Sequence, residues 1–174
     1  ALEVARETGT HAMFHVGHNV GTFSPDFIRQ LLPELQAGDI ITHIYTDNLG
    51  GVLDANRRLV PEATAALERG VWMDVGAGRT QLGFDAARRI MDQGIVAHSI
   101  SSDTTSANRA GSVHSFAEMM TRFLALGLSL EEVVAMSTIN AARVLGIEAT
   151  HGTLQPGRSA DISVLDLQDG EWTV

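Results

Sequence analysis

Three side chains that could bind a divalent metal ion stand at the ends of separate apolar runs. His15 lies within one run, His43 closes a second, and Asp103 follows a third at residues 94–102. Short apolar runs of this kind are typical of buried parallel strands, whose carboxyl ends meet at one edge of a sheet. Imidazole nitrogens and carboxylate oxygens are ordinary ligands of divalent ions. The pattern therefore predicts a metal site at that edge, with strands holding the three groups a few ångströms apart.

The elements that must position these residues alternate along the chain. Strands are predicted at residues 12–17, 39–44, 71–76 and 94–103. Helices with apolar stripes are predicted at residues 24–38, 61–70, 83–92, 115–126, 129–136 and 138–146. Strand-then-helix units spaced by roughly 28 to 30 residues favour a parallel sheet with helices outside it. Four such units make either a doubly wound sheet or half of a barrel.

The two ends of the chain carry different signals. Residues 1–7 are typical of the tail of a helix, closed by residues 8–10, so we expect that the natural protein begins further upstream. Residues 152–158 form a turn-rich link, and residues 161–166 alternate in the manner of a β-strand. We therefore expect a boundary at about residue 150, with a β segment beyond it.

The composition narrows the classes of function. With 174 residues, 44% hydrophobic content and 17 glycines, the chain can bury a core of its own. Its net charge of -9 would repel nucleic acid and anionic membranes, and no basic run offsets this charge. The absence of cysteine excludes disulfides and Cys-type zinc fingers. The chain shows no signal-peptide pattern at its start and no apolar stretch of membrane-spanning length, so we expect a soluble, cytoplasmic protein.

The C-terminal third resembles a known family. Asn140 to Gly146, followed by Gly152 to Ile162, is similar to the C-terminal signature of the amidohydrolase superfamily of metal-dependent hydrolases. This resemblance implies that residues 1–150 form the last four βα units of a TIM-type (β/α)8 barrel. Residues 151–174 would then be a β segment of the small accessory β-domain. The segments around His15 and His43, together with residues 74–78, look most like the dihydroorotase-like deacetylase branch.

The resemblance also implies roles for the three side chains. His15 and His43 match, by order and spacing, the family's metal ligands after barrel strands five and six, and Asp103 matches the carboxylate after strand eight. In the family this carboxylate helps to bind metal and takes a proton from the attacking water. The implied activity is metal-assisted hydrolysis of an N-acyl or cyclic amide, most simply with Zn²⁺.

The chain also departs from the family pattern. The family's first strand supplies a His-x-His pair, and its fourth strand often supplies a carboxylated lysine that bridges two metal ions. This chain has no His-x-His, and all 12 of its basic residues are arginine. Half of the family's metal site is therefore missing. We expect a partner that completes the barrel, which is either the upstream half or another copy of the chain.

Other residues on the predicted active-site loops are weaker candidates. Gly76, Gly78, His18 and Arg79 are candidates for substrate binding, as are Gly50, Gly51 and Arg109. The glycines could equally be simple turns, and the histidine and arginines could be solvated. Asp103 could instead cap a helix. His98 is expected in the core or behind the metal ligands, and His11, His114 and His151 at the surface.

Three hypotheses for function remain open from the sequence. The first is the C-terminal half of a metal-dependent amidohydrolase that is catalytic only together with its upstream half. The second is a non-catalytic binding or structural protein derived from such an enzyme. The third is an unrelated doubly wound binding domain, which is disfavoured because no phosphate-binding glycine motif follows any predicted strand.

Overall fold

The structure is a computed structural model that describes residues 1–17, 24, 26–111 and 115–171. Its elements follow in the order α1 (Leu2–Thr8), β1 (Met13–His15), α2 (Phe27–Leu31), the 3-10 helix η1 (Leu32–Glu34), β2 (Ile40–Thr42), α3 (Pro61–Glu68), β3 (Trp72–Met73), α4 (Phe84–Asp92), α5 (Phe116–Ala125), α6 (Leu130–Ser137) and α7 (Ile139–Val144). Strands and helices alternate as far as α4, and helices follow. This order confirms the predicted α/β class.

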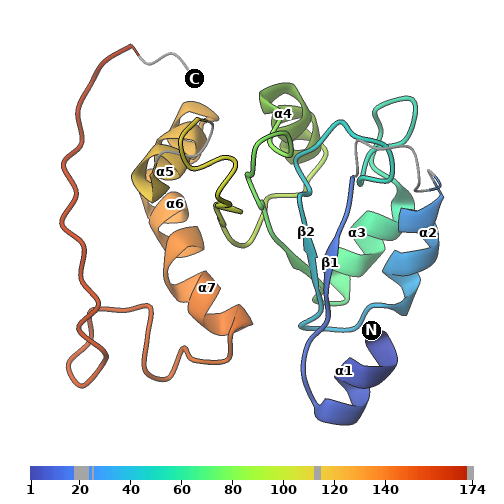
Figure 1. Ribbon diagram of the computed structural model, residues 1–174, viewed down its shortest axis with the longest axis horizontal. Coiled ribbons are helices and arrows are strands. Elements are labelled where there is room, and N and C mark those ends of the chain that lie inside the picture. The colour runs from blue at the N-terminus through green and yellow to red at the C-terminus, as the bar shows by residue number, and fades with distance from the viewer. Residues whose placement is uncertain (18–23, 25, 112–114, 172–174) are drawn as a thin grey trace.

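The three strands form a parallel sheet in the order β1, β2, β3 (Figure 1). Met13 of β1 lies opposite Ile40 of β2, which lies opposite Trp72 of β3. The parallel register places the carboxyl ends of β1 and β2 at the same edge, where His15 and His43 stand.

The fourth predicted strand is realised only in part. Residues 98–102 run parallel to the end of β3, with the N–H of His98 on the carbonyl of Met73 at 2.7 Å and the N–H of Ala77 on the carbonyl of Ser101 at 2.9 Å. One regular bridge joins Asp74 and Ser99. Among the described residues, this segment pairs as a strand only with residues 73–78. Val96, two residues before the segment, is 45% exposed. A strand that pairs along one side only lacks the second row of hydrogen bonds that would hold it in a regular conformation.

The helices cover the sheet with small and branched apolar residues. In Figure 1, α2 and α3 lie on one side of the strands, and α5, α6 and α7 lie on the other. Ala63 and Ala66 of α3 are buried, as are Ile41 and Met73 of the sheet. The predicted helix at residues 24–38 is shorter than expected. Pro33 lacks an N–H and cannot continue an α-helix, so α2 ends at Leu31 and η1 follows.

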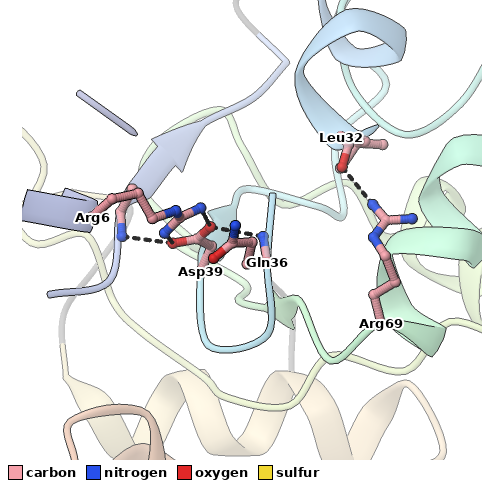
Figure 2. Close-up of polar contacts among 6 residues, drawn as sticks. Arg6, Leu32, Gln36, Asp39 and Arg69 are labelled. Atoms are coloured by element: carbon pink, nitrogen blue, oxygen red, sulfur yellow. Dashed lines mark hydrogen bonds and ion pairs between the residues drawn. The ribbon is translucent and has the colours of Figure 1, made fainter. Parts of the chain in front are cut away.

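An ion pair closes the end of the sheet where the strands begin (Figure 2). The Asp39 side chain is fully buried and accepts hydrogen bonds from Arg6, at 3.0 Å from Nη1, and from the N–H groups of Ala12 and Gln36, each at 2.9 Å. Burial alone would raise the pKa of Asp39, but these hydrogen bonds outweigh it and lower that pKa to about 2. Asp39 thus ties α1 to the starts of β1 and β2.

The chain after α7 runs outside α5, α6 and α7, away from the sheet (Figure 1). Its apolar side chains Leu154, Ile162, Val164 and Leu167 are exposed, Val164 at 94%. Residues 161–166 form no strand within the described part of the chain, because a strand needs a neighbour to receive its hydrogen bonds. Their place in an accessory β-domain stays a prediction.

Among the helices of the described residues, none combines the length and the apolar character that crossing a bilayer requires.

Candidate active site

His15 and His43 lie side by side at the carboxyl edge of the sheet. His15 is the last residue of β1 and pairs in register with Thr42, directly before His43. The two imidazole centroids are 4.2 Å apart, with an angle of 62° between the rings. His43 is 4% exposed, whereas His15 is exposed. The structure therefore brings together the two imidazoles that the sequence places on separate strands.

The hydrogen bond of His43 determines which ring nitrogen can bind a metal ion. Its Nδ1 lies 2.6 Å from the backbone carbonyl oxygen of Gly76. Because a carbonyl oxygen can only accept, Nδ1 must carry the proton, and the neutral ring then keeps a free lone pair on Nε2. An imidazole held by a carbonyl at one nitrogen, with the other nitrogen open, is the usual arrangement of a metal-ligating histidine.

Backbone strain marks the same residues. Among the described residues other than glycine, His43, Arg57 and Asp103 have positive φ, at 69°, 58° and 47°. Such conformations cost about 1–3 kcal/mol each and cluster at functional sites, where the surrounding structure enforces them. Two of these three strained residues, His43 and Asp103, are predicted from the sequence to bind a metal ion.

The glycine loop 76–78 connects His43 to Asp103. A Cβ atom on Gly76 would lie 2.5 Å from Nδ1 of His43, and a Cβ atom on Gly78 would lie 2.6 Å from Oδ2 of Asp103. Both glycines have a φ of +51°. A Cβ atom on Gly76 would meet the buried side chains of Thr42 and His43, so the close approach requires glycine there. A Cβ atom on Gly78 would meet only the end of the exposed Asp103 side chain, which can move.

Asp103 lies on an exposed loop rather than at the start of a helix. Its backbone carbonyl accepts a hydrogen bond from Nδ2 of Asn108 at 2.8 Å. No helix begins within residues 104–111, and α5 is capped by Ser115, which accepts from the N–H of Glu118. The capping alternative for Asp103 therefore has no support in the described residues.

The imidazole pair fits a divalent ion only as part of a ligand set. Within residues 1–17, 24, 26–111 and 115–171, no group of three or more His, Cys, Asp or Glu side chains could hold a metal ion. The structure thus joins His15 to His43 but does not bring Asp103 into one cluster with them. That all three bind one ion stays a prediction. The lone pair on Nε2 of His43 fits zinc, which prefers neutral imidazole.

The candidate substrate-binding residues fall into two groups. Arg79 is exposed on the turn after Gly78, and the carbonyl of Gly50 accepts from the N–H of Gly17 at 3.2 Å. Arg109 lines a cavity of about 490 Å³. The other lining residues come from the chain on either side of Asp103 and from the start of α5: Ser102, Thr104, Thr105, Ser106, Ser115 and Phe116. His18 lies outside the described residues, so its role stays a prediction.

The other histidines differ in exposure and in their hydrogen-bond partners. His11 is exposed, and His151 is half-buried, with Nδ1 2.8 Å from Oγ1 of Thr150. His114 lies outside the described residues. His98 is only partly buried rather than in the core, and its Nδ1 accepts from the N–H of Met73 at 2.9 Å. Burial lowers the pKa of His98.

Asp74 is a buried residue of this region that the sequence did not single out. This carboxylate is 4% exposed and accepts hydrogen bonds from the hydroxyl groups of Thr42, Ser99 and Ser101. A charged residue inside an apolar run is unusual, so the position of Asp74 within residues 71–76 could have indicated a functional or structural role.

Comparisons with known proteins identify the family of this chain. The sequence profile of the Amidohydrolase family matches residues 1–173. A deacetylase of Enterococcus faecalis is 29% identical over 164 residues, covering 93% of this chain and 43% of the relative. A deacetylase of Brucella anthropi is 25% identical over 169 residues, covering 97% of this chain and 40% of the relative. The chain thus spans about two fifths of the length of these relatives.

Solved structures show the same relationship. An adenine deaminase superposes with a TM-score of 0.81 at 27% identity, over 91% of this chain and 42% of that protein. A dihydroorotase superposes with a TM-score of 0.72 at 25% identity, over 84% of this chain and 38% of that protein. Since the family profile covers nearly every residue, the chain belongs to the amidohydrolase family.

Proposed function

We propose that this chain is the C-terminal part of a metal-dependent hydrolase that cleaves amide C–N bonds in N-acyl or cyclic amides. The main support for this proposal is the hydrogen bond from His43 Nδ1 to the carbonyl of Gly76, which places the lone pair of the neutral ring on Nε2, together with the closeness of the His15 ring. Family membership and the deacetylase relatives support hydrolysis at a C–N bond. Within this proposal, residues 1–150 are the last four βα units of a (β/α)8 barrel.

The proposal assigns the rest of the metal site to an upstream half of the barrel. The relatives are more than twice as long as this chain, which covers 43% and 40% of them. Met13 on β1 and Val96 before residues 98–102 are 56% and 45% exposed, at the two sides of the parallel array. A barrel would cover both sides. A second copy of the chain would bring more of the same ligands, so the upstream half is the better partner.

The described residues have separate tasks in this reaction. His15 and His43 would hold the ion, most simply Zn²⁺, which when bound lowers the pKa of water and polarises the substrate carbonyl. Asp103 accepts the proton of the attacking water and returns it to the leaving amine, as a general base and then a general acid. The glycine loop lets both His43 and Asp103 approach closely.

The cavity beside Asp103 favours an N-acyl amino acid as substrate. Its lining combines Arg109 with several hydroxyl groups and the ring of Phe116. A guanidinium with hydroxyl neighbours suits a carboxylate, and the ring suits an apolar side chain. Ser102 and Thr104, the chain neighbours of Asp103, also line the cavity, so we expect the amide bond of such a substrate to lie near that carboxylate.

The test uses the protein encoded by the full reading frame, loaded with zinc and supplied with N-acetyl amino acids and cyclic amides. Asp103→Asn should lower kcat by about 10²–10⁴-fold with little change in Tm. Asp92→Asn, at the exposed end of α4, is the matched control and should keep full activity. Near-normal turnover by Asp103→Asn would remove Asp103 from proton transfer. Absence of hydrolysis in the zinc-loaded protein would favour the non-catalytic alternative.

A further inference from the structure

Asp74 is a buried carboxylate whose partners in the described part of the chain are hydroxyl groups rather than a cation. It follows β3 and is 4% exposed. Asp39, the other fully enclosed carboxylate considered above, has Arg6 as its partner. Burying a carboxylate is costly unless its oxygens are well hydrogen-bonded, so the three hydroxyl donors must compensate for lost hydration.

We propose that Asp74 is a positioning residue of the active site, which fixes both the Gly76 carbonyl that orients His43 and the segment that carries Asp103. The catalytic role that we give to Asp74 rests on the proposed function. The effect of Asp74 on the orientation of His43 can be tested without an activity assay.

The first connection runs from Asp74 to His43. Ser101 Oγ donates to Asp74 Oδ2 at 2.6 Å. Because this uses the single hydroxyl proton of Ser101, its oxygen is left to accept, and it receives the N–H of Gly76 at 3.1 Å. The carbonyl of Gly76 in turn accepts from His43 Nδ1 at 2.6 Å. The carboxylate is therefore linked to the imidazole by hydrogen bonds to Ser101 and Gly76 and through the backbone of Gly76.

A second contact reaches the residue before His43. Thr42 Oγ1 donates to the same oxygen, Asp74 Oδ2, at 2.7 Å. His43 follows Thr42 directly and has a positive φ of 69°. Such a conformation persists only where neighbouring contacts enforce it. Thr42 on one side and Gly76 on the other supply those contacts, and both are tied to Asp74.

The third connection runs towards Asp103. Ser99 Oγ donates to Asp74 Oδ1 at 2.7 Å, while Ser101 binds Oδ2. These serines are alternate residues of one extended segment, so they present the same face to the carboxylate. The backbone bonds from Val75 to Ser99 and from Ala77 to Ser101, at 3.2 and 2.9 Å, show the same register. Asp103 follows two residues later, so the register of this segment determines where it lies.

The two serines provide matched variants. Ser99→Ala and Ser101→Ala each remove one hydroxyl donor to Asp74, but only Ser101 also contacts Gly76. Asp74→Val removes the acceptor altogether, whereas Asp74→Asn keeps one oxygen for Thr42 and Ser101. Asp39→Asn is a second control, since Asp39 is a buried carboxylate at the opposite end of the strands.

The test is ¹⁵N NMR of the His43 ring in the zinc-free protein of the full reading frame, with zinc affinity as a second readout. Native protein and the Ser99→Ala, Asp39→Asn and Asp74→Asn variants should show the tautomer with the proton on Nδ1. Ser101→Ala and Asp74→Val should populate the other tautomer and weaken zinc binding by about 10–100-fold.

Two results would overturn the inference. One is an unchanged His43 tautomer in the Ser101→Ala variant. This variant provides the test even if Asp74→Val does not fold. The other is an equal effect of Ser99→Ala and Ser101→Ala. If the tautomer responds as expected but the native protein hydrolyses no amide, Asp74 still positions His43 and the proposed function alone is wrong.

Discussion

Gly78 and Asp103 approach so closely that a Cβ atom on Gly78 would lie 2.6 Å from Oδ2 of the carboxylate. The atom that would have to move is the end of a side chain, on an exposed residue. A substitution at Gly78 would therefore be relieved by displacing Asp103 rather than by disturbing the core.

This relationship predicts an effect of Gly78→Ala that separates activity from stability. The φ of Gly78 is +51°, so alanine should cost about 1 kcal/mol of unfolding free energy through backbone strain. Turnover should fall by at least about 10²-fold, because the carboxylate is displaced from its position for proton transfer.

Gly9→Ala is the matched control for this experiment. Gly9 has a φ of +65°, and a Cβ atom there would meet nothing within 4 Å. It should show the same loss of unfolding free energy with unchanged kcat. Equal kcat in Gly78→Ala and Gly9→Ala would mean that the position of Asp103 is unimportant.

The Arg6–Asp39 pair predicts a specific loss of stability in acid. The pKa of Asp39 is lowered from 3.8 to about 2. A lowered pKa means that the folded state favours the carboxylate, so the stabilisation is present above pH 3.8 and is lost as pH falls through about 2. This shift corresponds to about 2 kcal/mol of unfolding free energy.

Denaturant unfolding at a series of pH values measures this contribution. The native protein should lose about 2 kcal/mol more than Asp39→Asn between about pH 5 and pH 2, because the variant has no charge to neutralise. Parallel stability profiles for the two proteins would show that the ion pair does not lower the pKa of Asp39.

The imidazole pair predicts which substitutions remove bound zinc. His43→Asn removes the Nε2 ligand while tolerating the positive φ at this position, since asparagine adopts that conformation readily. Elemental analysis after dialysis should show at least one zinc equivalent fewer than in the native protein. His11→Asn, at an exposed histidine, should keep the native zinc content. Native zinc content in His43→Asn would exclude His43 as a ligand.

The exposed apolar side chains predict that the 174-residue chain alone associates with itself. Val164 and Met13 are 94% and 56% exposed, and exposed apolar strands and edges favour association. Size-exclusion chromatography with light scattering should therefore detect species larger than the monomer, and the separately expressed upstream half should convert them into a one-to-one complex. A monodisperse monomer that hydrolyses amides at ordinary enzymatic rates would contradict the half-barrel proposal.

Local signals in the sequence were sufficient for most of the helices. Pro61 begins α3, and Ser129 with Glu132 forms a capping box at the start of α6, in which the N–H of Ser129 donates to Glu132 at 2.7 Å. These signals act within one turn of helix. The alternation of strands also predicted that His15 and His43 would meet, because parallel register fixes which strand ends share an edge.

Contacts between distant residues could not be predicted in the same way. The hydroxyl partners of Asp74 come from residues 25 to 32 positions away, and no short motif encodes them. The carbonyl that orients His43 is 33 residues downstream. The incomplete pairing of residues 98–102 likewise depends on whether a second strand lies next to them, and their own sequence does not specify this.

A crystal structure of the full-reading-frame protein, with an anomalous difference map at the zinc edge, would test most directly whether His15 and His43 bind one metal ion. We expect a peak about 2.0–2.2 Å from Nε2 of His43 and from a ring nitrogen of His15, with Nδ1 of His43 still donating to the carbonyl of Gly76. A zinc peak that contacts neither imidazole, or His15 and His43 side chains that point to opposite faces of the sheet, would contradict this expectation.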